Sequence, residues 1–338
     1  MLYWRLKDEP ARSRMPAAIR EQLSQHYRAA VHHSLAQQAH LRQLLRGLAD
    51  AAITPVLLKG ALLAQTVYPS PVCRPMGDID LWVRDDEIER AWTVLEELGY
   101  SHRDKGRRPL ALQQENEGEV QFWGGGAQPM LIELHWGAFP GEWLKLTTRT
   151  QAEAIRERLI PVSLLGEPAW ALSPEDNLIQ VATHVAVNHR MAVNALRSLL
   201  DVALITQQPM DWDVLVQRAR RWHLATTIGY VLEMAYGLFG LEALTPGIER
   251  LRLSSPRRAY LMAHVNPASL TDRANQRIQT IGWSHHTIQF GLIDRPTDLV
   301  RLLAHSLWPD DGWLEKRYGA GGWAVRLRHT TGALRGRF

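Results

Sequence analysis

The feature that most constrains this fold is a strictly alternating segment at residues 77–84, with the sequence G-D-I-D-L-W-V-R. Isoleucine, leucine and valine occupy every second position of it. Because successive side chains of a β-strand point to opposite faces, this pattern predicts a half-buried strand. The opposite face carries Asp78 and Asp80, two carboxylates separated by one residue. The sequence therefore predicts a sheet that is covered on one face and carries polar side chains on the other.

Helical and strand-like patterns around this segment indicate an α+β core. Residues 17–52 carry leucines at helical spacing, and residues 56–58 form a short apolar run followed by a helical pattern. Residues 119–123 and 130–136 predict two more strands, joined through three consecutive glycines. The expected fold class is thus α+β, with a small sheet and helices, followed by a mainly helical domain.

The change of pattern along the chain predicts four parts. We expect an N-terminal helical segment over residues 1–50, an α+β core over 51–146 and a mainly helical domain over 147–315. The helical domain is indicated by apolar residues at helical spacing and by capped helix starts. A basic tail is expected over residues 316–338, which contain six basic and no acidic residues.

Composition excludes several classes of protein. No apolar run approaches the roughly 20 residues that cross a bilayer, so no membrane association is expected. The single cysteine, Cys73, excludes an internal disulfide and fits a reducing compartment. With no apolar leader at the N-terminus, the sequence predicts a cytoplasmic protein. The net charge of +4 is compatible with a nucleotide or nucleic-acid partner but does not require one.

Three acidic side chains could form a metal centre. Asp78 and Asp80 project from one face of their strand, roughly 7 Å apart at the backbone, so both could reach a pair of ions about 4 Å apart. Glu133 lies in an apolar stretch, with its flanking residues pointing the other way, and could complete the cage. Carboxylates are ligands that Mg²⁺ prefers. The alternative is that the two aspartates are the solvent-exposed face of an edge strand.

Several short motifs, in this order, resemble the uncharacterised nucleotidyltransferases of the DNA polymerase beta-like superfamily. The motifs are Lys59-Gly60, Arg74-x-x-Gly77-Asp78-Ile79-Asp80-Leu81-x-Val83 and Glu133-Leu134-His135-Trp136. The resemblance implies a small mixed sheet with helices, two Mg²⁺ ions held by the three carboxylates, and a nucleoside triphosphate as substrate. It also implies that Lys59, Gly60, Arg74 and Gly77 contribute to nucleotide binding.

The first motif departs from the wider superfamily, in which Gly-Ser precedes the helix. Here Lys59-Gly60 stands in that place. Gly60 could still allow the backbone to approach a triphosphate at a helix N-terminus, and Lys59 could supply positive charge directly. Arg74 could pair with a phosphate or with Asp78. The alternatives are an exposed lysine and a turn glycine.

The helical part carries a second set of residues that resemble the same family, namely His184, His189, Arg197 and Asp201. The two histidines are five residues apart, which places them about 140° apart around an α-helix. They are not the i, i+4 pair of a helical zinc site, and we expect each to be a packed or pocket-lining histidine. The resemblance allows a substrate role for one of them.

Together these observations predict a magnesium-dependent enzyme that transfers a nucleoside monophosphate from a nucleoside triphosphate to a hydroxyl acceptor and releases pyrophosphate. The acceptor stays open among a small molecule, a peptide or protein, and tRNA. One alternative is a nucleotide-binding protein that kept the fold without catalysis. Another is an RNA-binding protein that acts through the basic tail, where Tyr318 and Trp323 stand among the basic residues.

Overall fold

The computed structural model describes residues 2–6, 15–103, 110, 113, 118–192, 195–272 and 283–334. The chain divides into two compact units. One, here called the sheet unit, consists of Met1–Arg103, Val120–Trp136 and Leu159–Leu172. The other, the helical unit, consists of Asp104–Glu119, Gly137–Arg158 and Ser173–Phe338.

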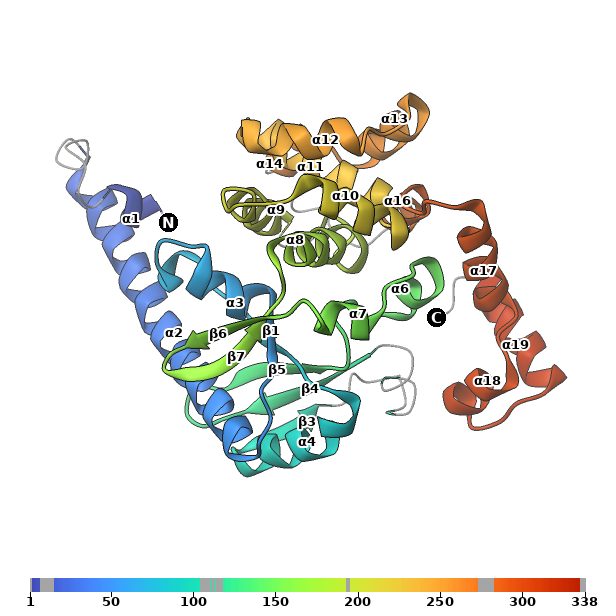
Figure 1. Cartoon of the computed structure of the whole chain (residues 1–338), viewed down its shortest axis with the longest axis horizontal. Coiled ribbons are helices and arrows are strands. Elements are labelled where there is room, and N and C mark those ends of the chain that lie inside the picture. Colours follow the sequence, from blue (N-terminus) through green and yellow to red (C-terminus); the bar gives the residue numbers. More distant parts are fainter. Residues whose placement is uncertain are drawn as a thin grey trace. The chain divides into compact units, whose positions relative to one another are not determined.

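The sheet unit is built on a mixed seven-stranded sheet with the order β3-β4-β5-β2-β1-β7-β6 (Figure 1). The pairs β2–β5 and β1–β7 are parallel, whereas β1–β2, β3–β4 and β6–β7 are antiparallel. The strands are β1 (Val56–Leu58), β2 (Asp78–Trp82), β3 (Tyr100–Arg103), β4 (Glu119–Gly124), β5 (Met130–His135), β6 (Ile160–Leu164) and β7 (Glu167–Ala171).

One face of this sheet is covered by helices. In Figure 1, α2 and α4 run along the same side of the strands. The alternating apolar residues of β2 and β5, such as Ile79 and Leu134, share one buried cluster with Leu44 and Leu48 of α2 and Leu95 of α4. The helices of this unit are α1 (Leu2–Leu6), α2 (Ala17–Asp50), α3 (Lys59–Thr66), α4 (Ile88–Glu97) and the 3₁₀ turns η2 (Pro71–Cys73) and η3 (Asp85–Glu87).

Local signals in the sequence explain where α4 begins and ends. The backbone N–H of Arg84 donates to Glu87 Oε2 at 2.9 Å, which caps the acidic η3 turn that leads into the helix. Gly99 follows the helix with φ +83°, a left-handed conformation that favours glycine. An acidic first turn and a glycine after the last turn thus bound this helix.

The helical unit contains the remaining helices. They are α6 (Glu142–Thr147), α7 (Ala152–Arg156), α8 (Pro174–Thr183), the π-helix η5 (His184–Asn188), α9 (Ala195–Ile205), α10 (Trp212–Arg221), α11 (Ala225–Phe239), η6 (Glu242–Leu244), α12 (Thr245–Arg250), α13 (Ser255–His264), α14 (Pro267–Thr271), α16 (Trp283–Gly291), α17 (Pro296–Leu307), α18 (Asp311–Tyr318) and α19 (Trp323–Leu334). Within the described residues, no helix is both long and apolar enough to cross a membrane.

The predicted fold class is confirmed: the chain is α+β, with a mixed sheet and a helical C-terminal region. The β6–β7 hairpin joins the sheet beside β1, so the sheet unit takes in residues from beyond position 146. Such long-range pairing has no signal in local periodicity. Much of the basic tail is helical, in α18 and α19, and residues 335–338 lie outside the described part.

The covered face of the sheet should dominate the stability of the sheet unit. Leu134→Ala removes a fully buried side chain of β5 and should lower the free energy of unfolding by about 3 kcal/mol, because the cavity it leaves is lined by the helix–sheet core. Ile160→Ala, at an exposed position of the edge strand β6, is the matched control and should cost much less. Denaturant unfolding followed by circular dichroism measures both. Equal losses would contradict the assignment of this face as the core.

Candidate active site

The register of two parallel strands brings the central carboxylates together. In the β2–β5 pair, Asp80 lies directly opposite Glu133, and Asp78 lies opposite Leu131. The antiparallel pairing of β1 with β2 places Leu58, the last residue of β1, opposite Asp80. Because α3 begins at the next residue, the start of that helix lies beside the same carboxylate. Three separate segments of the chain therefore meet at Asp80.

The residue that begins α3 is ion-paired with the buried carboxylates. Lys59 Nζ lies 2.6 Å from Asp80 Oδ1 and 3.8 Å from Glu133 Oε2. All three side chains are largely buried, and Asp80 is only 2% exposed. The other oxygen of Glu133, Oε1, accepts a hydrogen bond of 2.6 Å from Gln121 Nε2 on β4. Buried charges of this kind are tolerated only when they are paired and hydrogen-bonded.

A histidine on β5 completes the cluster. His135 is fully buried, and its Nε2 lies 3.0 Å from Asp80 Oδ1 and 3.8 Å from Glu133 Oε2. Since a carboxylate can only accept, Nε2 carries the proton in this arrangement. The sequence places His135 on the face of Glu133, two residues further along the strand, but it does not predict the contact with Asp80. Only the strand register reveals that contact.

The neighbours of Asp80 decide its charge. Burial by itself would raise the pKa of this carboxyl, but the positive charge of Lys59 and the hydrogen bond from His135 outweigh the effect of burial. The pKa of Asp80 is therefore held well below its usual range. The carboxylate of Asp80 therefore stays ionised inside the protein, and a cation-binding site requires an ionised carboxylate.

The donor atoms of this cluster fit a divalent cation. One ligand atom each from Asp80, Glu133 and His135 lie within 4.8 Å of one another. Carboxylate oxygens suit Mg²⁺, and an imidazole nitrogen is also a common ligand of Mn²⁺ and Zn²⁺. Asp78 lies on the same face of β2, half-buried, but is not part of this converging set. An ion bound here would have to share Asp80 with the ammonium group of Lys59, or displace it.

The predicted nucleotide-binding residues surround the start of α3. Lys59 has φ +48°, a left-handed conformation that is strained for a residue with a side chain and is often found at functional sites. A Cβ added at Gly60 would lie 3.0 Å from Met76 Cγ and 3.4 Å from Arg74 Nη1. The Arg74 guanidinium, which is buried, therefore lies next to the first turn of this helix. Gly77 is different, because an added Cβ there would meet no atom within 4 Å.

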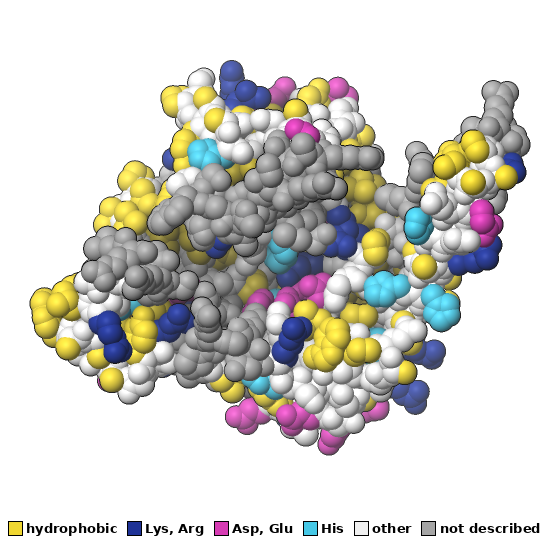
Figure 2. Space-filling view, turned by 180° about the vertical axis from the view of Figure 1, so that it is seen from behind, with side chains coloured by type: hydrophobic (Ala, Val, Ile, Leu, Met, Phe, Trp, Pro, Cys, Tyr) yellow, Lys and Arg dark blue, Asp and Glu magenta, His cyan; other side chains and the backbone are white. Residues whose placement is uncertain are grey.

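Exposed acidic side chains gather elsewhere in the sheet unit. They include Asp85, Asp86 and Glu89 of η3 and α4, and acidic side chains are visible along the lower edge of the face in Figure 2, where these elements lie. These residues form an ordinary solvated surface. Asp80 is not part of it, so the reading of this aspartate as a solvent-exposed residue of an edge strand does not hold. β2 itself is an inner strand, between β5 and β1.

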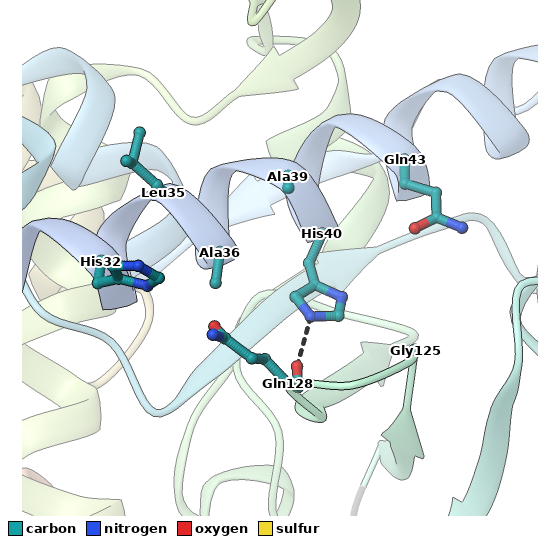
Figure 3. A pocket seen from close by; sticks show the side chains of 8 residues that line it. All are labelled: His32, Leu35, Ala36, Ala39, His40, Gln43, Gly125 and Gln128. Atoms are coloured by element: carbon teal, nitrogen blue, oxygen red, sulfur yellow. Dashed lines mark hydrogen bonds between the residues drawn. The ribbon is translucent and has the colours of Figure 1, made fainter.

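The sheet unit also has a cavity of about 360 Å³ between α2 and the turn from β4 to β5 (Figure 3). His40 reaches from α2 into it and contacts the carbonyl oxygen of Gln128 at 2.7 Å. The other ring nitrogen of His40 lies 2.6 Å from the hydroxyl of Tyr100. No carboxylate lines this cavity among the described residues. It is therefore separate from the cluster around Asp80.

The two histidines of the helical unit correct an expectation from the sequence. His184 Nε2 and His189 Nε2 lie 2.7 Å apart, so the two rings form a pair. The placement of the two residues about 140° apart assumed an α-helix, but residues 184–188 form a π-helix in which the N–H of His189 donates to the carbonyl of His184. The wider turn brings residues five apart to the same side. Single π-turns of this kind occur frequently at functional sites.

Comparison with known proteins assigns the chain to a family. Residues 1–240 match a protein family described as "uncharacterised nucleotidyltransferase". No match was found among curated proteins. Among solved structures, the chain is similar to an antigenic nucleotidyltransferase-like protein from Paracoccidioides brasiliensis, with 13% identity and a TM-score of 0.35. That similarity covers 69% of this chain and 90% of the other, and at this TM-score it supports no conclusion. The family match, in contrast, spans well over half of the chain.

The buried ion pair at the start of α3 should be essential for stability. Lys59→Met leaves the carboxylates of Asp80 and Glu133 without the ammonium group and should lower the free energy of unfolding at pH 7 by about 3 kcal/mol. Lys145→Met, at an exposed position, is the control and should change little. Urea unfolding measures both. A loss for Lys59→Met no larger than that of the control would show that the pair is not formed in solution.

The same pair gives the pH dependence a definite sign. Because the pKa of Asp80 is depressed in the folded protein, its stabilising contribution is complete above about pH 4 and is lost as the pH falls further. The free energy of unfolding of the wild type should therefore fall between pH 4 and pH 2. That fall should be smaller in Lys59→Met, because the pKa of Asp80 moves back up. Parallel pH profiles would contradict this origin.

Proposed function

The chain belongs to the uncharacterised nucleotidyltransferase family, and from this premise we propose that it transfers a nucleoside monophosphate from a nucleoside triphosphate to a hydroxyl acceptor in a magnesium-dependent reaction. The observation that supports this most is the meeting of Asp80, Glu133 and Lys59 on the face of the β2–β5 pair that points away from the core shared with α2 and α4. The carboxylate oxygens of Asp80 and Glu133 can bind cations, and the ammonium group of Lys59 can bind a phosphate. Transfer of a phosphoryl or nucleotidyl group requires both kinds of contact from a protein.

The metal ligands are the carboxylates of Asp80 and Glu133, with two ions in the bound state. Divalent ions supply neutralisation of the triphosphate and orientation of the reacting groups. The third ligand has two candidates. Asp78 follows from the resemblance of the sequence to the family, whereas His135 follows from the convergence of donor atoms. For His135 to bind an ion through Nε2, its ring must carry the proton on Nδ1 instead.

The remaining residues act on the nucleotide and the acceptor. Lys59 and Arg74 supply positive charge to the triphosphate, Gly60 allows the first turn of α3 to approach it, and Gly77 precedes the metal-binding strand. The acceptor oxygen attacks the α-phosphorus while the bond to the bridging oxygen of pyrophosphate breaks. The proton of the acceptor hydroxyl passes to Glu133, which acts as the general base. The acceptor itself is a small molecule, a peptide or protein, or tRNA.

A second candidate function, nucleotide binding without transfer, has one specific observation in its favour. The ammonium group of Lys59 already neutralises Asp80 at 2.6 Å. If the ion pair between Lys59 and Asp80 persists when a nucleotide binds, the protein would bind the nucleotide without a metal ion at Asp80. The two candidates differ in whether a divalent ion binds to the protein at all.

Transfer activity should depend on the buried carboxylates and not on exposed ones. The protein is incubated with each α-labelled nucleoside triphosphate, Mg²⁺ and cell extract, and the labelled product is identified. Asp78→Asn with Asp80→Asn, and separately Glu133→Gln, should abolish labelling, because the ions lose their ligands. Because Asp80→Asn also breaks the pair with Lys59, circular dichroism establishes that each variant is folded under the assay conditions. The control Asp85→Asn with Glu97→Gln removes exposed carboxylates and should retain activity. Labelling that survives in the first two variants would remove these residues from the reaction.

Binding of Mn²⁺ identifies the third ligand independently of activity. If His135 binds the ion, the electron paramagnetic resonance spectrum of bound Mn²⁺ shows coupling to a nitrogen nucleus. His135→Gln should remove that coupling and weaken binding by about tenfold or more, whereas Asp78→Asn should leave the coupling in place. The control is His26→Gln, at an exposed position of α2. If bound Mn²⁺ shows no nitrogen coupling in the wild type, and Asp78→Asn weakens binding whereas His135→Gln does not, the ligand is Asp78.

A further inference from the structure

A pocket in the helical unit is lined largely by arginines. It has a volume of about 220 Å³ and lies among the end of α10, the start of α11 and the connection from α12 to α13. Four arginines line it, namely Arg220, Arg250, Arg252 and Arg257. The other lining residues are neutral, so in the described part of the chain no carboxylate lines this pocket. It lies outside the cluster around Asp80, and neither the family match nor the proposed function gives it a role.

Three of the guanidinium groups are held in place by neutral acceptors. Arg250 donates from Nη1 to the backbone carbonyl of Pro246 at 3.1 Å. Arg257, which is half-buried, donates from Nη1 to Thr226 Oγ1 at 2.8 Å. Arg220 donates from Nη2 to the backbone carbonyl of Arg250 at 2.8 Å. A neutral acceptor fixes the position of a guanidinium but leaves its charge uncompensated. Each group has five N–H donors, so most of them stay available for another acceptor.

The nearby acidic side chains offset only part of this charge. Arg250 Nε donates to Asp213 Oδ1 at 3.0 Å, but the side chain of Asp213 is 85% exposed, and such a surface pair contributes little. Asp294 accepts hydrogen bonds of 2.8 Å from the backbone N–H groups of Ala225 and Thr226. The carboxylate of Asp294 thus binds the N–H groups at the start of α11 and not a guanidinium group of the pocket. The pocket keeps an excess of positive charge.

We propose that this pocket binds a phosphate group. Guanidinium groups match the oxygens of a phosphate in geometry and charge, often through two parallel hydrogen bonds. A bound dianion would also relieve the repulsion among four like charges. The volume is below the roughly 300–1,000 Å³ typical of sites that enclose a whole drug-sized ligand, so a phosphate group fits better than a complete nucleotide. That group belongs either to a small phosphorylated compound or to the backbone of an RNA.

The composition of the chain does not by itself account for the cluster. Arginine is abundant, since only five of the 39 basic residues are lysines, and scattered exposed arginines are therefore expected. These four line one pocket without a lining carboxylate, and three of them donate to neutral atoms. Arg252 has no acidic partner within the described residues. Anchored, uncompensated charge in a concave site is what an oxyanion site requires.

Anion binding by the full-length protein tests the proposal directly. Calorimetric titrations at low salt use inorganic phosphate, pyrophosphate and a short single-stranded RNA as probes. The variant Arg252→Gln with Arg257→Gln should weaken binding by about tenfold or more, because two charge-assisted contacts are lost. The control Arg42→Gln with Arg46→Gln removes the same charge from exposed positions of α2 and should bind as the wild type does. Circular dichroism and melting temperatures establish that all proteins are folded.

The salt dependence distinguishes the two sources of the phosphate group. If the ligand is RNA, the slope of the logarithm of affinity against the logarithm of salt concentration should decrease in magnitude by about one in the pocket variant. If it is a small compound, the pocket variant should lose phosphate and pyrophosphate binding while RNA affinity stays equal to that of the control. The proposal is overturned if the wild type binds none of these anions at low salt, or if the pocket variant binds all of them as tightly as the control.

Discussion

The structure of the candidate site depends on one buried electrostatic balance. Parallel pairing of β2 and β5 sets Asp80 beside Glu133, and two carboxylates in a dry environment repel each other and lose hydration. The protein can hold them there only by bringing cations and hydrogen-bond donors to the same place. Lys59 and His135 supply these from α3 and β5. Lys59 adopts a strained left-handed backbone conformation at the start of α3, where its side chain lies beside Asp80.

This balance links stability to function. The ammonium group of Lys59 stabilises the folded protein by pairing with Asp80, and in the proposed reaction the same group faces a triphosphate and competes with metal ions for the same oxygen. Because the lysine already pairs with Asp80, the site can bind a divalent ion at this oxygen only if the lysine moves toward another anion. The phosphates of the substrate are such an anion. In this view nucleotide and metal binding are coupled, because each makes the rearrangement favourable for the other.

The helical unit adds chemistry that the carboxylate cluster does not contain. The π-helix at residues 184–188 turns two histidines toward each other, and the arginine-lined pocket concentrates positive charge at the start of α11. Neither feature is needed to build a helical bundle. Both place polar groups at points where the regular backbone pattern is interrupted, which is where recognition residues are commonly found.

Patterns in the sequence were enough to predict the fold class, the covered face of the sheet and the resemblance to the family. Alternation in residues 77–84 fixed which side chains of β2 are buried, because side-chain direction on a strand follows from position alone. The sequence pattern does not show which carboxylates lie next to each other. That depends on strand register, and the addition of β6–β7 and the contact of His135 with Asp80 likewise arise from pairing between distant segments. The pairing of His184 with His189 was hidden for a related reason: the sequence pattern does not distinguish a π-turn from an α-turn. Tertiary structure decided these points because they depend on distances between segments, and a linear pattern contains no such distances.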